Sequence, residues 1–211
     1  LAGGADPNAR ERASGQTALM WAVAGSHTAI ARALVDAGAV IEARSNGAFT
    51  PLLFAARAGA LDAARLLVEE AGADVNAMTA DGLSPLLVAA ASLEAITGSD
   101  YRLVREPSEH EALGIFLLDR GADVHQADQF GMTPLHHAVE MGKPALLGVL
   151  LANQADPNRQ LTSGLPFRRG DYVGRGAYNG ATPFWLAARL GELRLQFGAR
   201  AQLRLEGGVG L

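Results

Sequence analysis

Histidine is the residue type in this chain best suited to metal binding or acid–base chemistry, and His136 and His137 stand side by side. Adjacent residues of a helix point about 100° apart, so a helical pair of this kind does not chelate one ion. The segment that begins with His110 and Glu111 starts like the zinc-protease motif HExxH, but Gly114 stands where the second histidine ligand belongs. Neither pattern predicts a metal site.

Aspartates recur at one place in a repeated turn: Asp6, Asp74, Asp123 and Asp156. Carboxylates that return at such a spacing are turn-forming groups rather than an acid and base pair. Asp62, Asp81 and Asp128 are expected to be lone carboxylates at exposed positions. The chain offers no Ser/His/Asp or Cys/His set and no glycine-rich phosphate cradle after a strand. We therefore expect no catalytic residue, no cofactor, no metal and no enzyme activity.

The composition is that of a folded protein, with 211 residues, 49% of them hydrophobic, and no Cys. A formal net charge of -4 gives no general field for nucleic acid. No apolar run reaches the length of about 18 residues that a membrane span needs, so no direct membrane insertion is expected. The lack of Cys fits a cytoplasmic or a periplasmic or secreted location equally, so localisation stays unknown. One Lys, Lys143, against 17 Arg suggests a bacterial source.

The elements that position all these residues are repeated along the chain. The segment GMTPLHHAV at 131 returns as GQTALMWAV at 15, AFTPLLFAA at 48, GLSPLLVAA at 82 and GATPFWLAA at 180. Thr or Ser is suited to cap a helix and Pro to its first position, so each copy predicts a helix start. A second pattern, GADPN, GAVIE, GADVN, GADVH and QADPN, predicts a glycine helix stop followed by an extended hairpin arm.

In the first full copy we expect helices near 18–25 and 28–37. Neither is long enough to be stable alone, so each must bury an apolar face against its neighbours. The expected buried residues are Leu19, Ala22, Val23, Ile30, Leu34 and Val35.

Paired TPLHxA and GADVN segments at a period near 33 residues resemble the ankyrin repeat, and the resemblance covers nearly all of residues 1–192. It implies an all-α solenoid of helix-turn-helix repeats with short β-hairpin fingers, with about five repeats plus a partial N-terminal one in a single domain, 1–211. It also implies that His136 is a scaffold residue that hydrogen-bonds through Thr133. The expected units are 1–11, 12–44, 45–78, 79–127, 128–159 and 160–198, with a tail over 199–211.

The spacing departs from 33 residues at three places. From Thr50 to Ser84 it is 34, and the extra residue is expected to loosen the EEAGAD turn while leaving the stacking intact. From Ser84 to Thr133 and from Thr133 to Thr182 it is 49, which gives two insertions of 16 residues. Such insertions map to solvent-facing loops that often carry specific contacts.

The first insertion, near 93–108, has two interpretations. It is either a contact loop or a lengthened helix whose apolar residues pack back on the stack, namely Leu93, Ile96, Tyr101, Leu103 and Val104. Pro107 is expected at the start of the helix that follows. The second insertion, near 160–177, is rich in Arg and aromatic residues, which are favoured at interfaces, although a variable decorative loop is equally open. After Thr182 the repeat is too short, so either a degenerate cap ends the stack or residues are missing between Leu190 and Leu195.

Without a candidate for chemistry, the sequence favours a protein–protein interaction scaffold that binds a protein partner through its fingers and concave face. The alternative is an ankyrin-like structural or gating part of a larger enzyme or multisubunit complex. Phe49, Leu83, Phe130 and Met132 either form an exposed strip across the fingers or cover their neighbours' hairpins. The expected partner-binding residues are Phe49, Arg57, Leu83, Phe130, Met132, Glu140, Met141, Phe167, Arg168, Arg169, Tyr172 and Tyr178.

Overall fold

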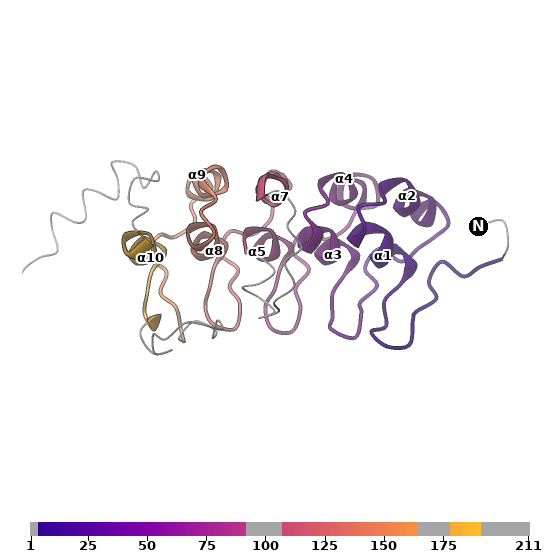
Figure 1. Cartoon of the computed structure of the whole chain (residues 1–211), viewed down its shortest axis with the longest axis horizontal. Coiled ribbons are helices and arrows are strands. Elements are labelled where there is room, and N and C mark those ends of the chain that lie inside the picture. Colours follow the sequence, from indigo (N-terminus) through magenta and orange to yellow (C-terminus); the bar gives the residue numbers. More distant parts are fainter. Residues whose placement is uncertain (1–3, 92–106, 164–177, 191–211) are drawn as a thin grey trace, which may run out of the picture.

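The computed structural model describes residues 4–91, 107–163 and 178–190. Its helices form two parallel rows in an elongated stack, and hairpin loops, here called fingers, project from the first row on the side away from the second (Figure 1). The first row holds α1 (Ala18–Ala24), α3 (Pro51–Ala58), α5 (Pro85–Ala90), α8 (Pro134–Glu140) and α10 (Pro183–Leu190). The second row holds α2 (Thr28–Asp36), α4 (Leu61–Arg65) with the π-helical turn η1 (Leu66–Glu70), α7 (Pro107–Asp119) and α9 (Pro144–Ala152). The all-α repeat prediction is confirmed.

Each first-row helix begins as its sequence predicts. The side-chain oxygen of the capping residue accepts a hydrogen bond from the amide three residues later, as in Thr50 Oγ1 from Leu53 N at 3.3 Å and Ser84 Oγ from Leu87 N at 3.3 Å. The cap residues are Thr17, Thr50, Ser84, Thr133 and Thr182. None of the described helices is long and apolar enough to cross a membrane.

Three first-row helices end in the same way. Ser26, Gly59 and Gly142 have positive φ, and the next backbone N–H folds back onto a carbonyl five residues earlier. These bonds run from His27 N to Ala22 O at 2.8 Å, from Ala60 N to Ala55 O at 3.0 Å and from Lys143 N to Ala138 O at 2.9 Å. The bond lets the chain turn directly into the second-row helix.

The core lies between the two rows and between successive repeats. Leu19 and Val23 are fully buried, whereas the prediction for Ile30 is wrong because its side chain is 56% exposed. In later repeats the same position is Ala63, Leu113 or Leu146, each fully buried. Those positions face the preceding helix pair, and the described residues place no helix before α1. Trp21, 62% exposed, has the same explanation.

Each finger is closed by a backbone pair at its base. The amides of Ser45, Thr79 and Asp128 donate to the carbonyls of Phe49, Leu83 and Met132 at 3.0, 3.0 and 3.1 Å, and Leu161 N donates to Ala181 O at 3.0 Å. The described residues contain no strand, only one isolated bridge between Arg10 and Thr17. The fingers are therefore hairpin loops rather than a sheet.

Side chains in the turns beside the fingers join one repeat to the next. The aspartates form turns as predicted, since Asn8 N donates to Asp6 Oδ1 and Asn76 N to Asp74 Oδ1, both at 2.9 Å. Asn76 Oδ1 in turn accepts from Asp123 N of the next repeat at 2.9 Å. These bonds fix the register between neighbours.

The extra residue of the second repeat does not loosen the EEAGAD turn. It lies inside the second-row helix as the π turn η1, where Ala71 N donates to Leu66 O at 3.1 Å. The π turn places Glu69 and Glu70 toward opposite neighbours, so that Glu70 pairs with Arg32 and Glu69 with Arg120. The expectation of a loosened turn is therefore wrong, because a helix can absorb one residue without losing its packed face.

Ala48 tests the finger geometry. It has φ +61°, whereas glycines occupy the same place in other fingers, for example Gly82 at +85° and Gly131 at +83°. A left-handed conformation costs a residue with Cβ about 1 kcal/mol or more, so Ala48→Gly should stabilise the chain by about 0.5 to 1 kcal/mol in urea unfolding.

The matched variant Gly131→Ala should destabilise by more than about 1 kcal/mol. Besides its positive φ, a Cβ there would lie 2.8 Å from Thr162 N. An Ala48→Gly variant that lost stability would contradict this finger geometry.

Candidate partner-binding surface

The predicted apolar strip across the fingers is not exposed at two of its four positions. Leu83 is 6% exposed and Met132 2%, and both belong to the core cluster. Their backbone groups close the fingers, which turns their side chains toward the helices. Phe49 and Phe130 are half-buried, and the Phe49 ring lies 5.6 Å from that of Phe54. An exposed strip is therefore wrong, and the alternative of side chains that cover the neighbouring hairpins describes Leu83 and Met132.

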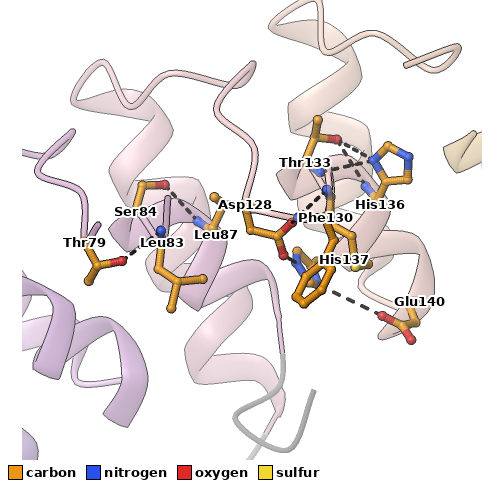
Figure 2. Close-up of polar contacts among 11 residues, drawn as sticks. Thr79, Leu83, Ser84, Leu87, Asp128, Phe130, Thr133, His136, His137 and Glu140 are labelled. Atoms are coloured by element: carbon orange, nitrogen blue, oxygen red, sulfur yellow. Dashed lines mark hydrogen bonds and ion pairs between the residues drawn. The ribbon is translucent and has the colours of Figure 1, made fainter. Parts of the chain in front are cut away.

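Asp128 is not a lone exposed carboxylate. Its Oδ1 accepts from Phe130 N and Met132 N, both at 2.9 Å, and so fixes the finger turn (Figure 2). Thr79 Oγ1 does the same work in the preceding finger by accepting from Leu83 N at 3.0 Å. The position calls for a side-chain acceptor, which the isolated reading of Asp128 did not reveal.

His137 lies between two carboxylates. Its Nε2 is 3.7 Å from Asp128 Oδ2 and its Nδ1 is 4.0 Å from Glu140 Oε2 (Figure 2). The His137 side chain is 4% exposed and that of Glu140 16% exposed. Glu140, expected to contact a partner, is thus turned toward the scaffold.

His136 and Thr133 form the reciprocal cap that was predicted. Thr133 N donates to His136 Nδ1 at 3.1 Å, and the Thr133 hydroxyl lies 2.8 Å from the same nitrogen (Figure 2). The histidine is fully buried, and burial lowers its pKa from the ordinary 6.5 to about 4. The backbones of Ala181 and Arg159 partly offset that effect. His136 is held neutral in the folded chain.

His110 and Glu111 contact neighbouring repeats. His110 Nε2 is 3.2 Å from Arg57 O, and Glu111 Oε1 accepts from Leu146 N at 2.9 Å. A Cβ at Gly114 would lie 3.0 Å from Leu146 Cδ1, so the residue that departs from the zinc motif allows close helix packing. Over residues 4–91, 107–163 and 178–190, no group of three His, Asp or Glu side chains is arranged to hold a metal.

The fifth finger gathers exposed aromatic and cationic side chains. The rings of Tyr178 and Trp185 meet edge to face at 6.0 Å, and the Arg189 guanidinium lies 4.5 Å from the centre of the Tyr178 ring. Trp185 is 43% exposed, although residues at its position in the other repeats, such as Leu53 and Leu87, are fully buried. We call Tyr178, Trp185 and Arg189 the finger-five cluster. The sequence reasoning missed Trp185, whose signal was a Trp at an otherwise fully buried position.

The second insertion begins later than its sequence suggested. Leu161 is 3% exposed and closes the finger with Ala181, and Gly180 N donates back to Leu161 O at 3.1 Å. Because Leu161 belongs to the core, the inserted part starts at Thr162 rather than at Gln160. Of the other predicted partner residues, Arg57 is exposed and Met141 is half-buried at the end of α8. Phe167, Arg168, Arg169 and Tyr172 lie outside the described residues, as do the first insertion and the segment around Leu195.

Comparison with known proteins agrees with this architecture. A family model described as "Ankyrin repeats (3 copies)" matches residues 1–79, and one described as "Ankyrin repeat" matches residues 130–159. The two matches together cover just over half of the chain.

Two curated relatives are similar over part of their length. The 2-5A-dependent ribonuclease of Mus musculus is 31% identical over 100 residues, which are 46% of this chain and 11% of the ribonuclease. That of Homo sapiens is 33% identical over 104 residues, which are 49% of this chain and 10% of the ribonuclease. The matched segment therefore spans about a tenth of each relative.

The neutral His136 makes stability depend on pH. In the unfolded chain the ring takes up a proton near pH 6.5, whereas in the folded chain it does so only near pH 4. The unfolded state binds more protons between these values, so acidification from about pH 6.5 to about pH 4 should lower the free energy of unfolding by up to about 3 kcal/mol.

His136→Leu isolates this contribution, because Leu53 and Leu87 fill the same position in other repeats. Urea unfolding of both proteins from pH 7 to pH 4 should show a steeper loss for the chain that keeps His136. Parallel pH profiles would show that the His136 ring is protonated equally in both states.

Proposed function

We propose, from the premise that this chain belongs to the ankyrin-repeat family, that it is a scaffold that binds a protein partner chiefly through its fifth finger. Ankyrin repeats generally mediate protein–protein interaction and are typically non-catalytic. The specific part of the proposal is the location of the contacts: the finger-five cluster together with the insertion 162–177.

The observation that carries the proposal is the exposed finger-five cluster. Tyr, Trp and Arg are the residue types most enriched among residues that dominate binding energy. Their rings and guanidinium already pack against one another, at 6.0 Å between Tyr178 and Trp185 and 4.5 Å between Arg189 and Tyr178, so little side-chain freedom is lost on binding. Large exposed aromatic surface at one place on a scaffold is typical of an interface.

The insertion adds to the same edge. It replaces the three-residue loop of a regular finger, such as 129–131, and it carries Phe167, Arg168, Arg169 and Tyr172. Because Leu161 and Ala181 pair at its base, the stack supplies fixed ends for a loop of variable sequence. We include these four residues among the partner contacts, with Arg57 and Met141 farther along the first row.

A second candidate is a structural or gating part of a larger enzyme or complex. The similarity to two proteins named as ribonucleases, over about a tenth of their length, favours it over an independent scaffold. The mass of the native protein separates the two candidates, because a species well above 22 kDa favours the larger assembly.

The test is binding of the chain to a partner captured from its native source and identified by mass spectrometry. Trp185→Ala and Arg189→Ala should each weaken affinity by about thirtyfold, which corresponds to about 2 kcal/mol. Arg32→Ala is the matched control, because Arg32 is an exposed arginine of the second row that pairs with Glu70. Equal affinity of all three variants would contradict a finger-five interface.

Excision of residues 162–177 tests the insertion separately. It joins Leu161 to Tyr178 and leaves Tyr178, Asn179 and Gly180 as a three-residue loop of the same form as 129–131. Gly180 keeps the positive φ, +77°, that this loop needs. We expect a folded chain of nearly unchanged melting temperature with affinity lowered at least tenfold, and unchanged affinity would show that the insertion is decorative.

A further inference from the structure

The carbonyl five residues after each cap is where a first-row helix is closed. In the first, second and fourth repeats these carbonyls belong to Ala22, Ala55 and Ala138, and each accepts the backbone N–H that lets the chain turn back. The equivalent carbonyl of the third repeat is Ala89. It stands at the C-terminal end of α5, where helix carbonyls lack intrahelical partners and carry partial negative charge.

The third repeat does not make this turn. α5 ends at Ala90, and Ala91 is already extended, with ψ 158°. The second-row helix α7 starts at Pro107, so His110, which corresponds to the donors His27, Ala60 and Lys143, lies in the first turn of that helix. The chain leaves the stack at the point where the closing N–H would otherwise be supplied.

Lys143 of the next repeat reaches the same carbonyl. Its Nζ donates to Ala89 O at 2.7 Å, while its own backbone N–H closes α8 on Ala138 O at 2.9 Å. The residue is 7% exposed, which is unusual for lysine. Glu111 is the charged neighbour, and its Oε1 is fixed by Leu146 N at 2.9 Å. Among the described residues, one lysine thus closes two helices in adjacent repeats.

We propose that Lys143 is a positioning residue whose ammonium replaces the missing closing donor of α5 and so holds the point at which the insertion after Ala91 leaves the stack. A compact ammonium fits a buried helix end, where the planar guanidinium of the chain's other cations would not be satisfied by a single carbonyl. Burial lowers the Lys143 pKa to about 8, so the amine stays mainly charged at neutral pH. The only lysine of the chain therefore has a use that arginine does not meet.

Lys143→Met removes the donor and keeps most of the side-chain volume. It should lower the melting temperature of the full chain by about 4 to 8 °C, and Lys143→Arg should not restore it. His27→Met is the matched control, since His27 holds the same repeat position but closes its helix through the backbone. That control should shift the melting temperature by less than about 2 °C.

A double-mutant cycle distinguishes this role from general packing. Deleting residues 93–108 and changing Glu109 to Gly gives the third repeat the same connection length as the first, with a glycine where Ser26, Gly59 and Gly142 have positive φ. A backbone N–H can then close α5, so Lys143→Met should shift the melting temperature of the shortened chain by less than about 2 °C. An equal shift in the full and shortened chains would overturn the proposal.

Amide exchange of the full chain decides the matter if the shortened chain does not fold. Lys143→Met should raise the exchange rate of the α5 amides, including Ala91 N, which donates to Leu87 O at 2.9 Å, by at least tenfold more than that of the α1 amides. A uniform rise along the chain, or no rise at α5, would contradict a local closing role.

Discussion

The structure depends on burial between neighbouring repeats, because its helices are too short to stand alone. Most of them contain five to nine residues, fewer than the twelve or so at which an isolated helix becomes even marginally stable. Each fully buried leucine, such as Leu53 or Leu87, contributes about 1.5 to 3 kcal/mol only while the adjacent pair is in place. Ile30 and Trp21 show the converse, since the same positions are exposed where no preceding pair is described.

This constraint explains how the departures from regular spacing are accommodated. Each one leaves the stacked faces intact and re-supplies the hydrogen bonds that it interrupts. The extra residue of the second repeat forms a π turn, the base of the fifth finger is closed by Leu161 and Ala181, and the open end of α5 is met by Lys143. Variable sequence can then be carried at the edge without loss of the core, which is how a rigid stack comes to present a specific surface.

Local chemistry accounts for what the sequence could predict. A Thr cap, a Pro at the first helical position and an Asp in a turn act within a few residues, so helix starts and turn carboxylates were correct, as at Thr50 and Asp74. The candidate site was less predictable, because exposure depends on how one repeat lies against the next. Leu83 and Met132 face the core, Asp128 is a turn acceptor and Trp185 is exposed, and each of these facts follows from pairing between segments rather than from spacing.

The account places recognition at the fifth finger and treats the remaining stack as its support. The most direct measurement is hydrogen–deuterium exchange of the chain alone and bound to its captured partner. Protection gained on binding should be concentrated in 178–190, which holds Tyr178, Trp185 and Arg189, and should be small in the second-row helices α2, α7 and α9. Protection of the second row with no change in 178–190 would contradict the account.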